Sequence, residues 1–253
     1  MTNKRVQEYI QSLKSINLEI TSLCNMSKEH CTQCPNAWRA QKFGNTKIKT
    51  PLIEQFFKDL ASNQYTGLTA FHSYNEPLMD KRIFDIIEMH KKICGAARVM
   101  VLSNGRLLTQ KKADRLMELK VDKITISAYE YSTFKRMEEM FDKLKIDNPD
   151  CEFDINHQTL DGRMQYYSYP TRKEIGLPTI QPCKRVKDQL VITATGDVQL
   201  CCYEWKRELN FGNINNKNIL KILEDSNYLD VRDDLIKGYR DKYYPCDRCI
   251  YAT

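Results

Sequence analysis

The sequence predicts an α/β fold, a partial (β/α)6 barrel of the TIM type followed by a small α+β domain. Two observations lead to this prediction. Strand-like and helix-like segments alternate over the first 150 residues, and the pattern changes from about residue 160 to a hairpin and short helices. Alternation of this kind is typical of parallel strands joined by crossover helices, with functional residues after the carboxyl ends of the strands. We divide the chain into residues 1–165 and 166–253.

Each strand of the first region is expected from a short apolar or alternating run. These runs are residues 15–21, 68–73, 98–102, 123–127 and a fifth around residues 153–155. Helices are expected where apolar residues recur at helical spacing, over residues 51–60, 80–93, 109–119 and 131–145. Thr50 and Thr109 are predicted N-caps, with Pro51 at the first helical position. Gly95 fits a helix end.

The second region reads differently. Residues 190–194 and 198–202 flank Thr195-Gly196-Asp197, which predicts a β-hairpin with a Gly-Asp turn. Helices are expected over residues 217–224 and 226–237. We assign this hairpin and both helices to the small C-terminal domain.

Composition excludes several classes of protein. The chain has 253 residues, with 39 Lys and Arg against 33 Asp and Glu. This basic surplus is spread along the chain, so we expect no nucleic-acid partner. No run approaches the roughly 18 apolar residues that span a bilayer, and Met1–Glu8 is no signal peptide, so we expect no membrane association and a cytoplasmic location. In that compartment ten cysteines indicate metal ligands or catalytic thiols, not disulfides.

Three cysteines follow the first predicted strand. Cys24, Cys31 and Cys34 have the spacing C-x6-C-x2-C. Three thiolates on one loop can hold three irons of a [4Fe–4S] cluster and leave the fourth iron open. A zinc site is the alternative, with His30 adjacent to Cys31, and three unrelated thiols are a third interpretation.

Four further cysteines form a second set. Cys183, Cys201, Cys246 and Cys249 have the spacing C-x17-C-x44-C-x2-C. Four thiolates suit a closed zinc site or a fully ligated [4Fe–4S] cluster equally well. Cys202 is expected on the opposite strand face from Cys201, and core packing is the default for Cys94 and Cys151.

The first cysteine loop resembles that of the radical S-adenosylmethionine (radical SAM) superfamily, through Glu19-x-Thr21-x-x-Cys24-Asn25. Further motifs follow the next strands in the family's order: Tyr74-Asn75-Glu76-Pro77, Ser103-Asn104-Gly105 and Ser127. The resemblance implies that SAM completes the first cluster, with cofactor contacts from Tyr74, Asn75, Glu76, Ser103, Asn104 and Ser127. The cysteine loop departs from the common C-x3-C-x2-C spacing by three residues and carries Gln33 in place of an aromatic residue. In the motif after the second strand, Tyr74 and Asn75 stand where the family has two glycines.

The C-terminal region resembles the twitch domain, a shortened SPASM domain, which implies an auxiliary [4Fe–4S] cluster on Cys183, Cys201, Cys246 and Cys249. Across nearly the whole chain the similarity is to family dehydrogenases that act on an aminocyclitol. It implies cleavage of SAM to a 5′-deoxyadenosyl radical. It also implies oxidation of a secondary alcohol of a cyclitol, amino sugar or sugar nucleotide to a ketone, with the auxiliary cluster accepting an electron. We predict Arg172, Tyr203 and Glu204 as catalytic residues, with Glu204 the better proton acceptor and Arg172 suited to orienting a hydroxyl.

Other functions stay open on the sequence. An epimerase of a sugar or peptide would need a cysteine hydrogen donor, for which Cys202 is the first candidate. A non-catalytic zinc-binding interaction protein is the alternative from another class. The dehydrogenase interpretation implies a small-molecule substrate and a one-electron donor such as flavodoxin or ferredoxin.

Overall fold

The computed structural model describes residues 3–26, 34–157 and 168–250. Their strands form one seven-stranded sheet in the order β5-β4-β3-β2-β1-β6-β7. The strands are β1 (Ser15–Leu18), β2 (Leu68–Phe71), β3 (Arg98–Ser103), β4 (Lys123–Ala128), β5 (Glu152–His157), β6 (Gln189–Ile192) and β7 (Val198–Gln199). All neighbours are parallel except β6 and β7. The sheet is open, with β5 and β7 at its edges, as the partial barrel predicts.

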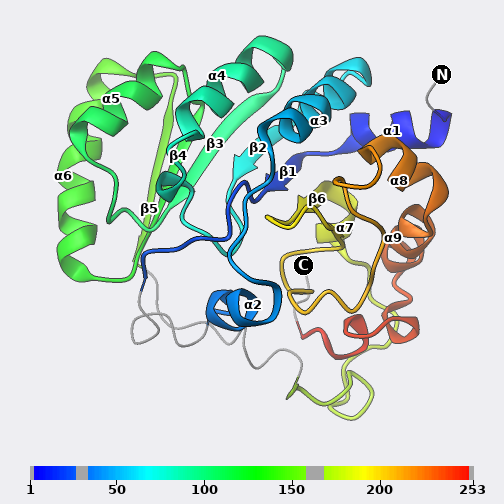
Figure 1. Cartoon of the computed structure of the whole chain (residues 1–253). Helices are drawn as coiled ribbons and strands as arrows, with labels where there is room; N and C mark the ends of the chain where they lie inside the picture. The colour runs from blue at the N-terminus through cyan, green and yellow to red at the C-terminus, as the bar shows by residue number, and fades with distance from the viewer. Residues whose placement is uncertain (1–2, 27–33, 158–167, 251–253) are drawn as a thin grey trace.

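Helices cover one face of this sheet and continue into the C-terminal region (Figure 1). They are α1 (Lys4–Ser12), α2 (Asn36–Phe43), α3 (Thr50–Ser62), α4 (Ile83–Ile93), α5 (Gln110–Glu118), α6 (Tyr131–Asp147), α7 (Lys184–Asp188), α8 (Ile219–Asp225) and α9 (Tyr228–Lys237), with 3-10 turns η1 (Pro77–Met79), η3 (Arg240–Lys242) and η4 (Cys246–Arg248). The helices α1, α2 and α7 lie where none is predicted. Thr109 caps α5 as predicted, whereas Lys49, not Thr50, is the N-cap of α3.

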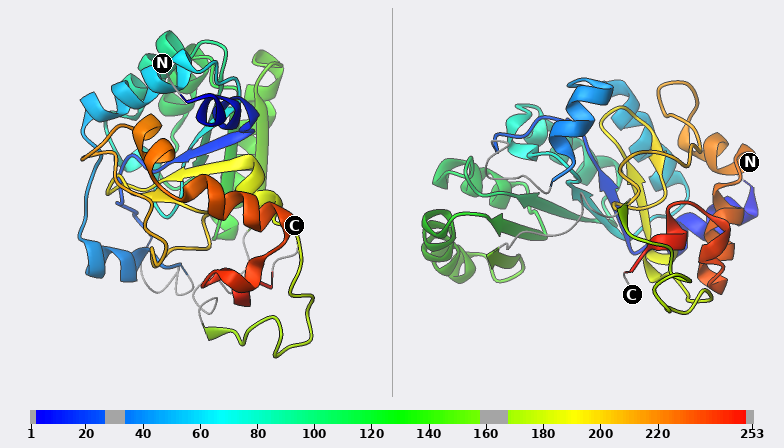
Figure 2. Two further views of the ribbon diagram at one scale, coloured as in Figure 1. Left: turned by 90° about the vertical axis from the view of Figure 1, so that its right-hand side faces the viewer. Right: turned by 90° about the horizontal axis from the view of Figure 1, so that it is seen from below.

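The predicted hairpin exists, but its first strand belongs to the main sheet. Ser15–Leu18 of β1 pairs in parallel register with Gln189–Ile192 of β6, so the hairpin supplies the sixth parallel strand. The two further views show β6 beside β1 and α9 close by (Figure 2). The predicted division between residues 165 and 166 falls outside the described residues and stays a prediction.

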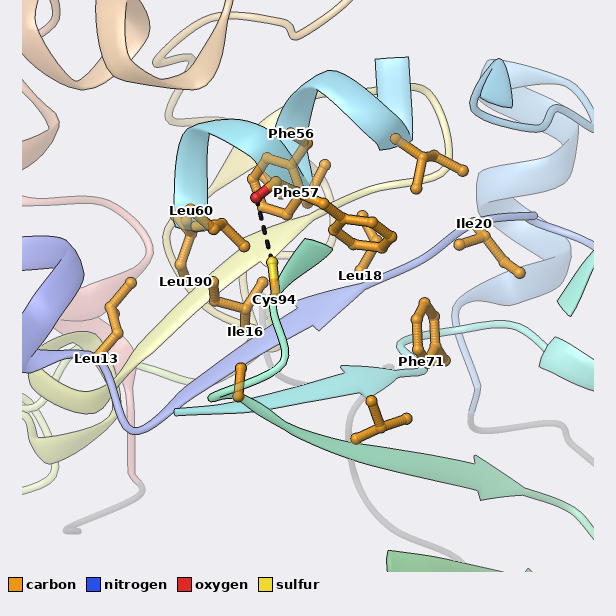
Figure 3. Packing of buried hydrophobic residues seen from close by; sticks show 14 of the residues in the cluster. Leu13, Ile16, Leu18, Ile20, Phe56, Phe57, Leu60, Phe71, Cys94 and Leu190 are labelled. Atoms are coloured by element: carbon orange, nitrogen blue, oxygen red, sulfur yellow. Dashed lines mark hydrogen bonds between the residues drawn. The ribbon is translucent and has the colours of Figure 1, made fainter. Parts of the chain in front are cut away.

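The core of the barrel lies between the sheet and its helices. Ile16, Leu18 and Leu190 pack beneath Phe57 and Leu60 of α3 (Figure 3). Cys94 is buried in this layer and donates a hydrogen bond to the carbonyl of Phe57 at 3.1 Å, which confirms the core role predicted for it. Because side chains alternate along a strand, Asn17 and Glu19 point to the opposite, concave face. That face carries the site.

Among the described residues, no helix combines the length and apolar character needed to cross a membrane.

Candidate active site

The first cysteine site lies beyond the carboxyl end of β1. Cys24 follows this strand, Cys34 lies two residues before the start of α2, and Cys31 lies outside the described residues. Asn104, after β3, places its side-chain nitrogen 3.9 Å from the Cys24 sulfur. Burial raises the pKa of the Cys24 thiol to about 11, with the neighbouring Glu76 and Cys34 adding to the shift. A thiolate at this position therefore needs a compensating positive charge, such as bound iron provides.

Glu76 connects the loop after β2 to both neighbouring loops. Its backbone N–H donates to the carbonyl of Leu23 at 2.8 Å, which joins it to the cysteine loop. Its buried carboxylate accepts from the Ser103 hydroxyl at 2.9 Å and the Asn104 backbone N–H at 2.7 Å. Burial raises the pKa of Glu76, although these hydrogen bonds oppose the shift. The structure thus gathers three of the predicted cofactor residues around Cys24.

The other predicted cofactor residues lie nearby in the fold. Tyr74 is buried, and its hydroxyl donates to the carbonyl of Cys202. The Asn75 side chain accepts from the backbone N–H of Ser73 at 3.0 Å, which shapes the turn after β2. Ser127 stands near the carboxyl end of β4, paired with Asn156 of β5. Their contacts with SAM stay a prediction.

Sequence reasoning missed an ion pair at this end of the sheet. The guanidinium of Arg39 on α2 donates twice to the carboxylate of Glu19, at 2.9 and 2.8 Å. Burial alone would raise the pKa of Glu19, but the charge and hydrogen bonds of Arg39 hold it below its usual value. The available signal was a charged residue inside the apolar run Leu18-Glu19-Ile20, which usually requires a buried partner.

A pair of polar side chains lies on the concave face. A ring nitrogen of His72, just after β2, is 3.2 Å from the side-chain oxygen of Asn17 on β1. The parallel register places both residues on the same face of neighbouring strands, since Asn17 pairs with Ala70. These side chains add polar groups to the concave face at the carboxyl ends of β1 and β2.

The second cysteine site is a small cavity in the C-terminal region. Cys183, Cys201, Cys246 and Cys249 all line it, together with Arg185, Val186, Leu200, Tyr203, Leu235 and Arg240. Burial raises the pKa of Cys201, and the neighbouring thiols of Cys202, Cys246, Cys183 and Cys249 raise it further. In the described part of the chain, no three His, Cys, Asp or Glu side chains gather tightly enough to hold a metal ion. The four thiols instead form the walls of a space, an arrangement that fits a cluster of several irons.

The predicted catalytic residues occupy different positions around this cavity. Tyr203 lines it, and the guanidinium of Arg185 lies 4.9 Å from the Tyr203 ring centroid. Glu204 is buried, and its carboxylate accepts from the backbone N–H of Glu208 at 2.5 Å. Arg172 is also buried and donates to the carbonyls of Pro178 and Cys249 and to the side chain of Gln181. The structure therefore places Arg172 at the C-terminal cysteine segment, and its predicted contact with a substrate hydroxyl stays a prediction.

Cys202 differs from its expected setting. The strand β7 ends at Gln199, so strand alternation does not govern Cys201 and Cys202. The Cys202 sulfur is 3.9 Å from a guanidinium nitrogen of Arg185. The prediction of opposite strand faces was wrong because the hairpin arm is only two residues long.

Aromatic side chains join the two cysteine sites. Tyr74 and Trp205 form a buried cluster, and the residues packed against it are Cys34, Trp38, Tyr169, Tyr203 and Cys249. Trp38 and Trp205 meet edge to face, with ring centroids 5.0 Å apart. The same apolar cluster thus contacts one cysteine from each site.

Comparison with protein families decides the assignment. The model of the radical SAM superfamily matches residues 18–156, and that of SPASM, an iron–sulfur cluster-binding domain, matches residues 183–250. The chain belongs to the radical SAM superfamily. This radical SAM protein is thus an enzyme that uses SAM and iron–sulfur clusters, and the resemblance predicted from its motifs is confirmed.

Relatives support this assignment over the whole length. The radical SAM protein is 24% identical over 239 residues to the S-adenosyl-L-methionine-dependent 2-deoxy-scyllo-inosamine dehydrogenase of Niallia circulans, covering 92% of this chain and 91% of the relative. Its fold matches BtrN in complex with AdoMet and 2-DOIA with a TM-score of 0.74, at 23% identity, over 94% of this chain and 93% of BtrN. It also matches anSMEcpe with bound AdoMet, with a TM-score of 0.56 at 14% identity, over 93% and 84% of the two chains. The predicted α/β class with a SPASM-type C-terminal region is confirmed.

Proposed function

We propose that this radical SAM enzyme oxidises a secondary alcohol of a cyclitol, amino sugar or sugar nucleotide to a ketone. The four-cysteine cavity carries the proposal, because an oxidation needs an acceptor for an electron beyond the first site. The similarity to an aminocyclitol dehydrogenase along nearly the full chain supports the same reaction.

The reaction divides between the cofactors and the protein. When bound, the cofactors supply hydrogen-atom abstraction from the alcohol carbon and an acceptor for one electron. The protein must hold the alcohol between the two cysteine sites and remove the hydroxyl proton. Loss of that hydrogen atom, one proton and one electron leaves a ketone.

Within this scheme Glu204 is the proposed proton acceptor, since it follows Tyr203 of the cavity wall and is a carboxylate. Tyr203 is proposed to contact the substrate. Arg172 holds the Cys249 segment through its backbone carbonyl, so we propose that it acts there by positioning this segment.

The proposal extends to partners and location. A flavodoxin or ferredoxin would deliver the electron that starts turnover. We also propose a cytoplasmic location, where a reducing environment keeps cysteines available as iron ligands.

The first experiment measures iron and sulfide per chain after anaerobic reconstitution. We expect about eight irons in the unchanged protein and about four in the Cys24→Ala/Cys31→Ala/Cys34→Ala variant, because each [4Fe–4S] cluster holds four. About four irons that are all lost in this variant would leave the C-terminal cysteines without a cluster and contradict the electron-acceptor role.

The second experiment incubates the reconstituted enzyme with SAM and 2-deoxy-scyllo-inosamine, then with other cyclitols and amino sugars. Formation of a product lacking two hydrogens, in equal amount to 5′-deoxyadenosine, supports oxidation. A product of unchanged mass and inverted configuration, lost in Cys202→Ala, would instead establish epimerisation.

Glu204→Gln should cut ketone formation while iron content stays unchanged.

A further inference from the structure

The helix α2 starts immediately after the first cysteine site and is held on two sides. On one side Arg39 reaches into the barrel and donates both ends of its guanidinium to Glu19. The side chains of this pair are 4% and 0% exposed, respectively. On the other side Trp38 packs on Trp205, and the guanidinium of Arg207 lies 3.7 Å from the ring centroid of Phe43.

The Glu19 carboxylate serves more than Arg39. It accepts the backbone N–H of Tyr74 at 3.1 Å and that of Ala194 at 2.9 Å. Tyr74 begins the loop that carries Glu76, and Ala194 follows β6. One carboxylate therefore joins the end of β1, the helix after Cys34, the loop after β2 and the turn after β6.

The loop after β2 is held to α2 by further contacts. The guanidinium carbon of Arg39 lies 5.0 Å from the centroid of the Tyr74 ring. The side chain of Asn36, at the start of α2, donates to the carbonyls of Ser22 and Tyr74. Cys34 and Glu76 thus lie on segments whose relative placement depends on the same small set of hydrogen bonds.

We propose that Arg39 and Glu19 are positioning residues for the first iron–sulfur site, which hold Cys34 and the Tyr74–Glu76 loop in the arrangement that binds SAM. The inference rests on membership of the radical SAM superfamily and is independent of the proposed alcohol oxidation.

The chemistry of the pair supports a role beyond packing. Removing two charges from water is costly, and apolar side chains of similar volume often fill such a space with equal or greater stability. A planar guanidinium bonded through both ends to a carboxylate instead sets orientation as well as distance. Because the contacts of Trp38 and Phe43 remain, loss of Arg39 should shift the position of α2 while the helix stays folded and packed.

The test compares Arg39→Met and Arg39→Lys with the unchanged enzyme after anaerobic reconstitution. Two readouts are measured without substrate: the affinity for SAM, and the change that SAM causes in the electron paramagnetic resonance spectrum of the reduced first cluster. We expect Arg39→Met to weaken SAM binding 10–100-fold, the usual range for a residue that orients metal ligands, and to lose the SAM-induced spectral change. Its auxiliary site should retain about four irons.

Lys91→Met is the matched control. It breaks a half-buried ion pair with Asp122, just before β4 at the opposite end of the sheet. SAM affinity and the SAM-induced spectral change should stay as in the unchanged enzyme.

Two results would overturn the proposal. One is an Arg39→Met protein that binds SAM with unchanged affinity and shows the unchanged spectrum. The other is used if Arg39→Met does not fold, and it is unchanged SAM binding by Arg39→Lys. Because Lys keeps the buried charge but lacks the two-pronged contact with Glu19, this result would show that the pair serves packing only.

Discussion

Two buried titratable side chains are expected to couple stability to pH, each in its own pH range. Glu19 has a pKa below its usual value, so its contribution to stability is complete above about pH 4.3 and is lost as pH falls through the lowered pKa. His90 on α4 is 0% exposed and donates or accepts a 2.8 Å hydrogen bond with Thr69 of β2. Burial, followed by the charge of Lys91, lowers the pKa of His90 to about 4.

His90 therefore destabilises the fold at mildly acidic pH. Below its usual pKa of about 6.5 the unfolded chain binds a proton that the folded chain does not, so stability should fall by about 2 kcal/mol between about pH 7 and about pH 5. Urea unfolding of His90→Gln, followed by circular dichroism, should show a smaller fall over this range. An identical fall in the variant would assign the pH dependence to other groups.

Glu76 offers a test at the cofactor site. In Glu76→Gln one carboxylate oxygen becomes an amide nitrogen, which cannot accept from the backbone N–H that it faces, either that of Leu78 or that of Asn104. A buried donor left unsatisfied costs about 1–3 kcal/mol, and we expect SAM binding measured by calorimetry to weaken by a comparable free energy. Glu139→Gln, an exposed position on α6, should bind SAM normally. Equal affinity in both variants would contradict a role for the carboxylate.

Among the elements, the hairpin formed by β6 and β7 has two tasks. The strand β6 completes the parallel sheet, and the turn and β7 lead to Cys201. The turn depends on Gly196, whose φ is +89° and whose added Cβ would lie 2.4 Å from the side-chain nitrogen of Asn215. The position of Cys201 at the auxiliary site should thus depend on the turn at Gly196.

Gly196→Ala should destabilise the protein by about 1–3 kcal/mol from backbone strain alone, with the close contact adding to this cost. We expect a lower melting temperature together with loss of iron from the auxiliary site. Gly176→Ala is the control, since its φ is +70° but no atom lies within 4 Å of the added Cβ. It should lower the melting temperature less and keep both clusters. Full iron content in Gly196→Ala would contradict the dependence of the auxiliary site on this turn.

The sequence predicts elements well where local signals are strong. The strand-end motifs around Glu76 and Asn104 were found because each follows an apolar run, and parallel strands bring such ends together. The pairing of Arg39 with Glu19 and of β6 with β1 joins residues far apart in the chain, so no local pattern reveals it. The position of Arg172 depends on the fold of the C-terminal cysteine segment, which short 3-10 turns define without periodicity.

For the molecule as a whole, the continuous sheet makes the two cysteine sites parts of one structure. The first follows β1, Cys201 of the second follows β7, and β6 lies hydrogen-bonded between those strands. The buried cluster of Tyr74 and Trp205 connects them on the concave side. Neither site has an independent framework.

Deletion of residues 183–253 should therefore disrupt the barrel as well as remove the second site. It leaves β1 as an edge strand paired only with β2 and uncovers Ile16 and Leu18, which pack beside Leu190. Analytical ultracentrifugation should detect association or aggregation of the shortened protein. A monodisperse, folded product of the deletion would contradict this dependence.

The position of β6 also limits how such enzymes can be recombined. A chimaera that receives its auxiliary region from another superfamily member also imports a strand of its barrel. The donor strand must match the recipient's β1 in register and present side chains of suitable volume where Leu190 and Ile192 meet the helices. Compatibility between donor and recipient is therefore decided in the hydrophobic core as well as at the cysteines.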